Sequence, residues 1–243
     1  IEDRTRTYTI AMERTVVPEN FSFRMTDEEY RVLEKIKNSI PVCYLADHAD
    51  FALGIVTGNN KKFLSAEKTQ HSEMVLKGTD ICKYHINPAK QYLRFEPEQF
   101  QQVAPLEIYR APEKLLYRFI SNQLVVAYDD RQMLSLNSCN IVIPKIEGMQ
   151  IKYILAILNS SVSQFVYQKE FHSIKVLRAH MEHIPIPRVG KAIQNEIIAM
   201  TEPLICGMGK EAAETCQKRL DCRIMDLFRL SAEEQWIIRH ALH

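Results

Sequence analysis

The side chains best suited to catalysis or metal binding form two short groups. Asp129 and Asp130 directly follow an apolar run and could hold a metal ion, although such a pair after a strand is more typical of a turn. His180 and His183, with His172 upstream, lack the H-E-x-x-H pattern of a zinc hydrolase, so we favour histidines in a polar loop or satisfied at an interface. A small standalone hydrolase using Asp129, Asp130 and His172 is kept only as a third hypothesis.

Several catalytic motifs are missing from the sequence. None of the ten prolines is adjacent to another, which excludes the Pro-Pro loop of amino methyltransferases. The one G-x-G, which starts at Gly207 and becomes G-x-G-x-x-A at Ala212, lies in a helical segment without the preceding strand that a nucleotide site requires. No lysine follows an acidic residue by two positions, as PD-(D/E)xK nucleases need, and G-x-x-x-x-G-K and G-x-S-x-G are absent. Whether the chain is an enzyme therefore stays open, and we expect no catalysis from this piece alone.

The composition is that of an ordinary globular protein. The 243 residues are 46% hydrophobic and 25% charged, enough for one large or two small domains, and no apolar run approaches the ~20 residues of a membrane helix. The six cysteines form no C-x-x-C pair, so we expect free thiols in a reducing cytoplasm. We expect Cys206, Cys216 and Cys222 to be small buried hydrophobes of a helical tail.

The first residues and the net charge suggest that the chain acts together with another part of a longer protein. The first four residues contain no start Met and no signal-peptide pattern, so we expect a fragment of a longer protein. The net charge is only +1, whereas a self-sufficient nucleic-acid binder is often more basic. Binding of nucleic acid would therefore depend on a local concentration of cations.

The N-terminal part is expected to be irregular and then helical. Residues 1–25 show an extended or irregular pattern. Thr26 and Glu29 form a capping box, and apolar residues at helical spacing follow it. The pattern predicts a helix over 27–39, which Pro41 ends.

Residues 42–145 are expected to be β-rich, because glycine, proline and asparagine separate short apolar runs. The best strands are 114–120, 124–128 and 140–143. Residues 121–123 fit a hairpin loop between the first two. A helix over 112–120, with Pro112 at its first position, is the alternative for the first strand.

The remainder is mostly helical. An apolar stripe predicts one helix over 150–169. The alternating prolines of 184–187 predict an edge strand or an extended linker. Residues 191–242 are expected to be helical, with a second capping box at Ser231 and Glu234.

A polar loop within residues 53–64 is the most informative segment. Gly54 and Gly58 flank apolar and small residues, and Lys61 and Lys62 supply two cations. Backbone N–H groups and short side chains would let this loop approach a phosphate closely. A solvated turn with both lysines in water is the alternative, and spacing alone favours it.

From about Phe21 to its end, the sequence resembles the TaqI-like C-terminal specificity domain of type II restriction–modification enzymes and N6-adenine DNA methyltransferases. The similarity includes the Leu158-Asn159-Ser160 helix, the closing Ile-Pro-Ile-Pro and a strand ending in Tyr-Asp. The segments that carry it, in order, are 29–36, 54–63, 76–81, 109–130, 154–161 with 184–187, and 226–234.

The resemblance implies an α+β fold, in which a β-rich target-recognition core is braced by helices and followed by a helical C-terminal tail. It implies an N-terminal segment and linker helix (1–41), a target-recognition domain (42–187) and a helical tail (188–243). Methylation, and any cleavage, would belong to an upstream methyltransferase domain of the same parent chain. S-adenosylmethionine would bind there, and this piece would hold no cofactor or metal. The partners would be duplex DNA and that upstream domain, in the cytoplasm and without a membrane.

The expected DNA contacts combine cations on phosphates with polar side chains on base edges. The phosphate contacts are expected from Lys61, Lys62, Lys83, Lys114, Arg118, Lys175 and Arg178. The base contacts are expected from Asn59, Asn60, Arg94, Arg110 and Gln123. Base-reading residues vary across the family, so no target sequence carries over. Lys61 and Lys62 lie where many relatives would have a single lysine.

A helical interaction module is the second function considered. The tail could dock a methyltransferase subunit or the methyltransferase domain of the parent chain. The near-neutral charge favours this reading, and both functions can hold together. The docking residues would be Leu220, Ile224, Leu227, Trp236 and Ile237.

Overall fold

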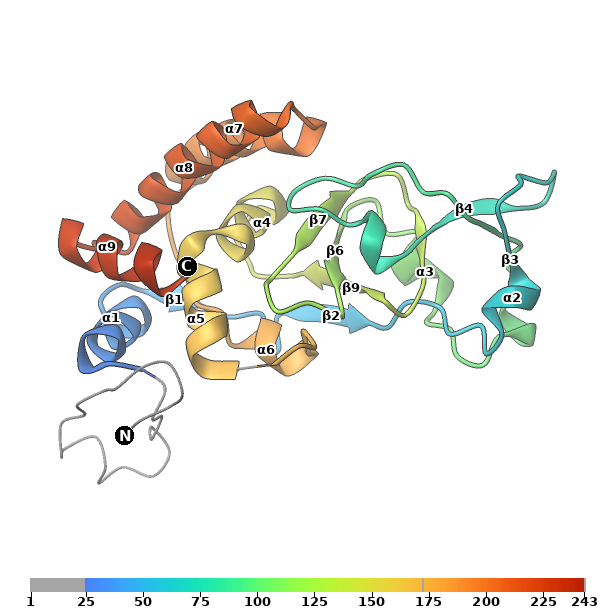
Figure 1. The fold of residues 1–243 in the computed structure, drawn as a ribbon, viewed down its shortest axis with the longest axis horizontal. Coiled ribbons are helices and arrows are strands. Elements are labelled where there is room, and N and C mark those ends of the chain that lie inside the picture. Colours follow the sequence, from blue (N-terminus) through green and yellow to red (C-terminus); the bar gives the residue numbers. More distant parts are fainter. Residues whose placement is uncertain (1–24, 172, 243) are drawn as a thin grey trace, which may run out of the picture.

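The computed structural model describes residues 25–171 and 173–242. Figure 1 shows an elongated molecule with helices gathered at one end, a sheet in the middle and a smaller β-rich lobe at the other end. The extended segment expected over 1–25 lies outside the described residues except for Met25, and so does His172.

A four-stranded antiparallel sheet forms the centre of the fold, in the order β2-β9-β6-β7. Its strands are β2 Ala49–Ala52, β9 Cys139–Pro144, β6 Lys114–Arg118 and β7 Val126–Asp129. The three strands expected in this region are therefore confirmed, and the helical alternative for 112–120 is wrong. The reason is that β6 is a central strand buried on both faces, with Leu115 and Tyr117 in one core and Leu116 in the other.

A second, smaller sheet builds the outer lobe in the order β3-β5-β4-β8. Its strands are β3 Leu64–Ser65, β5 Tyr92–Leu93, β4 Glu73–Leu76 and β8 Leu134–Ser135. Its short helical turns are α2 Asn60–Phe63, η3 Gly78–Asp80, η4 Pro97–Gln99 and α3 Leu106–Tyr109. At the opposite end, β1 Val42–Cys43 pairs with β10 Ile186–Pro187, which confirms the expected edge strand.

The longer helices brace the central sheet from the other side. They are α1 Asp27–Asn38, α4 Ile151–Asn159, α5 Ser161–Phe171, α6 Arg178–Glu182, α7 Lys191–Cys206, α8 Lys210–Leu227 and α9 Ala232–Ala241. Both expected capping boxes form, at Thr26 with Glu29 and at Ser231 with Glu234. Helices α1 and α9 lie side by side, and Lys35 and Glu234 form an ion pair of 2.5 Å between them. The α+β expectation, with a β-rich core and a helical tail, is thus confirmed.

The single helix expected over 150–169 is wrong, because the chain breaks at Ser160. This residue takes an extended ψ of 158°, ends α4, and accepts the N–H of Ser163 at the start of α5. The break places two amide side chains against the outer edge of β7 and the residues just before it. The Asn159 side chain accepts the N–H of Val126 and donates to its C=O, at 3.1 and 2.8 Å, while Gln164 does the same for Leu124 at 2.9 and 3.0 Å. These two side chains satisfy backbone groups that another strand would otherwise satisfy.

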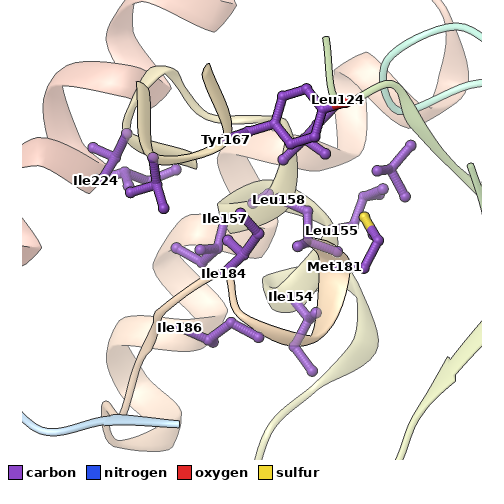
Figure 2. Close-up of a cluster of buried hydrophobic side chains, with 14 of the residues drawn as sticks. Leu124, Ile154, Leu155, Ile157, Leu158, Tyr167, Met181, Ile184, Ile186 and Ile224 are labelled. Carbon is purple, nitrogen blue, oxygen red and sulfur yellow. The ribbon is translucent and has the colours of Figure 1, made fainter. Parts of the chain in front are cut away.

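Two hydrophobic cores lie on either side of the central sheet. The larger one joins the helices to the sheet, and Figure 2 shows Ile154 and Leu158 of α4 close to Ile184 and Ile186. The smaller one lies between the central sheet and the outer lobe, around Ile55 and Tyr109. Packed side chains therefore hold the outer lobe against the central sheet, in addition to the chain connections.

The tail differs from expectation at its cysteines. Cys206 and Cys222 are exposed and Cys216 is half-buried, so the first two are not the buried hydrophobes expected. The G-x-G at Gly207 lies in the connection between α7 and α8, with no strand before it. Within residues 25–171 and 173–242, no helix is both long and apolar enough to cross a membrane.

Candidate nucleic-acid interface

The polar loop that follows Gly54 is a capped helical turn. The Asn59 side chain accepts the N–H of Lys62 at 3.2 Å, and the Thr57 hydroxyl donates to the Asn60 side-chain oxygen at 2.6 Å. Gly58 has a φ of +77°, which favours glycine. These bonds fix α2 in one geometry and leave Lys61 and Lys62 exposed at its surface. The loop is thus neither an open glycine-rich loop nor a simple solvated turn.

The underside of this turn is anchored by close packing. A Cβ added to Gly54 would lie 2.2 Å from the carbonyl oxygen of Leu136, so the backbone must approach strand β8 without a side chain. Phe63 packs edge-on against Phe100, with ring centroids 5.3 Å apart, and Phe95 packs against the same ring. The exposed lysines therefore project from a rigid support.

Neighbouring strands add further polar side chains to the same end of the lobe. Leu64 pairs with Leu93, which places the following residue, Arg94, beside the end of α2. Val56 forms a bridge with Gln102, and the Gln101 side chain lies 3.4 Å from the position a Gly58 Cβ would take. We call this exposed set the distal face, and its members are Asn59, Asn60, Lys61, Lys62, Arg94, Gln101 and Gln102.

A second exposed group lies near the junction of β6 and α6. Gln123 and Lys175 are exposed, and the ammonium of Lys175 lies 6.0 Å from the ring centroid of Phe119. Arg178 is also exposed but forms an ion pair of 2.7 Å with Glu182. Five of the expected contact residues (59–62 and 94) thus share the distal face, and three lie at this junction.

Lys114 has a structural role, and its expected phosphate contact is wrong. Its side chain is fully buried and forms an ion pair of 2.5 Å with Asp129, which is also fully buried. The ammonium also donates to the carbonyl of Tyr109 at 2.7 Å. Burial lowers the pKa of Lys114 below its usual range, against the opposing effect of Asp129. A phosphate could not reach this group without opening the core.

Two other expected contacts are engaged within the fold. Arg118 donates to the carbonyls of Gly78 and Ile81 at 2.9 and 2.5 Å, so it holds η3 against the central sheet. Arg110 binds both carboxylate oxygens of Glu73 at 2.7 Å. These bonds occupy the guanidinium groups, and neither arginine belongs to the distal face.

Lys83 lies far from the distal face, on the side covered by the helical tail. It donates to the carbonyl of Asn159 at 3.2 Å, and burial lowers its pKa, with Asp221 acting in the opposite direction. It lines a cavity of about 570 Å³ together with Tyr84 and α8 residues such as Gln217. Its expected phosphate contact is therefore not supported by its position.

The ionisable groups considered for metal chemistry also have structural partners. Asp129 pairs with Lys114 and accepts the N–H groups of Arg131 and Met133 at 2.9 and 3.0 Å. His180 stacks on Phe171, and burial lowers its pKa. Among the residues that the structure describes, no three His, Cys, Asp or Glu side chains are grouped so that they could hold a metal ion.

Sequence reasoning missed several residues of both exposed regions. Gln101 and Gln102 join the distal face only through pairing with residues more than 40 positions away. Ile120, Ile174 and Leu177 are exposed aliphatic residues, which in sequence are indistinguishable from core residues. Only the exposed fraction of each side chain could have identified them.

Residues 73–186, just under half of the chain, match the family described as the TaqI-like C-terminal specificity domain. The chain is therefore similar to that family over this range.

Solved structures of related systems resemble the chain at low identity. A chain of a type I R-M system is 13% identical with a TM-score of 0.46, and the match covers 88% of this chain and 51% of that one. The HsdS subunit from Thermoanaerobacter tengcongensis is 14% identical with a TM-score of 0.43, over 88% of this chain and 50% of that one. The type IIL restriction-modification enzyme MmeI, in complex with DNA, is 10% identical with a TM-score of 0.47, over 81% and 35%. The match thus spans about half the length of the first two chains and about a third of the MmeI chain. No curated protein matches this sequence.

Proposed function

We propose that the chain reads duplex DNA through the distal face. The observation that carries this proposal is the exposure of Lys61 and Lys62 on a capped, packed turn, while Lys114 and Arg118 are engaged inside the fold. A cation fixed on a rigid support loses little conformational freedom when it meets a phosphate.

The two lysines would set the register of the domain on the phosphate backbone, which carries no sequence information itself. Asn59 and Asn60 use their side-chain oxygens within the turn. Their amide NH₂ groups would donate to acceptors on base edges, such as N7 of a purine. Gln102 lies beside them on the paired segment and would extend this set.

The chemistry would reside in another part of the parent protein. We infer a cytoplasmic parent in which an upstream domain binds S-adenosylmethionine and methylates adenine, with or without cleavage. The support is the absence of a Pro-Pro methylation loop and of a nucleotide-binding turn from this sequence. In such a protein, the specificity domain would hold the site while the catalytic domain extracts the base.

The helical tail acts first as a brace. Leu220 and Ile224 are fully buried in the larger core and Leu227 and Ile237 pack against it, so four of the five proposed docking residues already have partners within this chain. Trp236 alone of that group is exposed. A docking role for the tail would therefore rest on Trp236 and not on a continuous apolar face.

The test is DNA binding by fluorescence anisotropy at several salt concentrations, using a randomised duplex pool and sequencing of the retained DNA. We expect an enriched short motif and a negative salt slope. Lys61→Ala/Lys62→Ala should make the slope less negative by about 1.8, since each lost phosphate contact removes about 0.9. Lys191→Ala/Arg219→Ala, which removes two exposed cations from the helical tail, serves as the matched control.

The outcomes separate the proposal from its competitors. An equal change of slope in both double variants would show a diffuse charge effect and contradict the assignment to α2. Failure of the wild-type chain to bind any duplex at low salt would contradict DNA recognition by this chain on its own.

A further inference from the structure

A cavity lies between the segment 82–85 and the helical tail. Its volume is about 570 Å³, and small-molecule sites occupy about 300–1,000 Å³. One face of α8 forms a wall, since the α8 residues that line the cavity recur at helical spacing. Most of the lining surface is apolar, as in sites that bind small molecules. The residues that line the cavity are Cys82, Lys83, Tyr84 and His85 of the segment, Leu204 of α7, Met208 after it, and Lys210, Ala213, Glu214, Gln217 and Lys218 of α8.

The backbone of Tyr84 is held beside β7 in an unusual conformation. Its φ of +73° lies in the left-handed region, which favours glycine. Its N–H donates to the carbonyl of Val126 at 2.7 Å, and its own carbonyl accepts the N–H of Tyr128 at 3.1 Å. The edge of the central sheet therefore fixes this backbone, and with it the place of the Tyr84 side chain in the cavity wall.

Two polar groups in the wall have no hydrogen-bond partner among the described residues. They are the hydroxyl of Tyr84, a residue that is only 2% exposed, and the buried side-chain NH₂ group of Gln217. Burial raises the pKa of Tyr84, and the Gln217 side chain lies close enough to act in the opposite direction. Buried polar groups are nearly always hydrogen-bonded, so these two neighbouring donors point to an acceptor that binds between them.

Cations outnumber acids among the side chains that line the cavity. Lys83 is half-buried and forms no ion pair with the other described residues, and Asp221, which acts on it, does not line the cavity. On the α8 wall, Lys210 and Lys218 are exposed beside a single acid, Glu214. Because a partly buried cation is stabilised by an opposite charge, this surplus favours an acceptor that is an anion.

We propose that the cavity binds a small apolar carboxylate. The carboxylate oxygens would accept hydrogen bonds from the hydroxyl of Tyr84 and the NH₂ group of Gln217, while Lys83 supplies the opposite charge. The apolar part of the ligand would lie against Leu204 and Met208. The cavity shares no residue with the distal face, so this inference does not depend on DNA recognition.

The experiment uses phenylbutanoate as the probe and phenylbutylamine, a cation with the same aromatic ring, as its matched control. Isothermal titration calorimetry on the full chain should show one site for phenylbutanoate and none for the amine. Phenylbutanoate should also raise Tm, because it binds only the folded chain. Tyr84→Phe and Gln217→Met each remove one donor with little change of volume. Each should weaken binding of the probe about tenfold or more, since hydrogen bonds to a charged group are the strong ones.

Tyr153→Phe is the control variant, because it also removes a buried hydroxyl. The Tyr153 hydroxyl donates to the carbonyl of Pro187 at 2.9 Å, and Tyr153 does not line the cavity. Tyr153→Phe should therefore lower Tm and leave binding of the probe unchanged. Tyr84→Phe should do the reverse: without probe its Tm should equal or exceed that of the wild type, because the Tyr84 hydroxyl gives up no bond within the fold.

Three results would overturn the proposal. The first is that phenylbutanoate does not bind at millimolar concentration, or that the amine binds as well. The second is equal binding of the probe to the wild type, Tyr84→Phe and Gln217→Met, which would place the probe elsewhere on the chain. The third is a fall in Tm for Tyr84→Phe without probe as large as that for Tyr153→Phe, which would make the Tyr84 hydroxyl a structural group. Gln217→Met alone provides the binding test if Tyr84→Phe does not fold.

Discussion

Replacing Lys114 with methionine would test whether this lysine holds the fold together or contacts DNA. In the structure its ammonium lies 2.5 Å from a carboxylate oxygen of Asp129, and both side chains are fully buried. Methionine is unbranched like lysine and one atom shorter, and it removes the charge, so it would leave the Asp129 carboxylate buried without its cation. The structural reading therefore predicts a loss of stability, whereas the phosphate reading predicts a loss of DNA affinity.

The loss can be sized from the groups that remain. Breaking a buried ion pair from one side costs about 3–5 kcal/mol. Asp129 still accepts the N–H groups of Arg131 and Met133, so we expect the lower end, about 3 kcal/mol. At about 2–4 °C per kcal/mol for a chain of this size, Tm should fall by about 6–12 °C.

The assay is urea unfolding followed by circular dichroism, with DNA binding measured on the same preparations. Lys114→Met/Asp129→Asn should recover most of the lost stability, because the amide keeps an acceptor and removes the unpaired charge. A variant Lys114→Met that unfolds like the wild type, but whose salt slope for DNA is less negative by about 0.9, would refute the structural reading.

Two further changes test other parts of the fold. Asn159→Ala should lower the free energy of unfolding by about 1–3 kcal/mol, because the buried N–H of Val126 loses its acceptor while the C=O keeps the N–H of Tyr84; thermal unfolding measures this. For Glu234, partial burial raises the pKa, but hydrogen bonds from Lys35 and Ser231 outweigh it and hold the pKa below its ordinary 4.5. The stabilisation is therefore present above about pH 4.5 and lost as the pH falls through the folded-state pKa. Glu234→Gln should cost about 0.5–1 kcal/mol at pH 7 and almost nothing at the lowest pH, as urea unfolding across pH would show.

Each of these changes has a control variant of the same residue type. Asn122→Ala alters an exposed asparagine near the edge strand and should leave Tm within about 1–2 °C, so an equal fall in both variants would contradict the role given to Asn159. Glu233→Gln removes the neighbouring exposed carboxylate of α9 and should show no such pH dependence. If Glu234→Gln lowered the free energy of unfolding equally from low to neutral pH, the ionised carboxylate would not be the source of the stabilisation.

The local signals in the sequence predicted the elements well because they act over a few residues. The capping box at Thr26 and the one at Ser231 each bind their partner three positions away, and both form as expected. The short apolar run of β6 is likewise a local signal, and its successive side chains lie in opposite cores. These signals depend only on neighbours in sequence, and the structure agrees with each of them.

The break at Ser160 was not predictable from periodicity, because its cause lies on another element. The apolar stripe of α4 continues into α5, and nothing in it marks an end. The partners of the two amides lie on another element, because Asn159 bonds to Val126 of β7 and Gln164 bonds to Leu124 just before it. The side chains of Asn159 and Gln164 can take the place of a neighbouring strand only when β7 lies beside them.

The same reasoning explains which contact residues were chosen wrongly. Lys114 and Lys61 are both lysines next to apolar runs, and sequence cannot separate a lysine that meets a buried carboxylate from one on a surface turn. The acid that engages Lys114 lies on the adjacent strand, at the paired position Asp129. The cation-rich segments therefore predicted correctly that the turn at α2 is exposed. They did not predict which of the cations are buried or paired.

The distribution of free cations limits how strongly this chain can bind DNA. Of the expected phosphate contacts, Lys61, Lys62 and Lys175 are exposed and form no ion pair with the other described residues, whereas Arg178 is paired with Glu182. Three contacts give a slope of log K against log salt of about −2.7, and raising the salt from ~50 to ~200 mM should weaken binding about 40-fold. A slope of about −6 or steeper would refute this, because it would require about four more phosphate contacts than these three cations supply. A slope near −3 would instead match the three exposed, unpaired lysines and the net charge of +1.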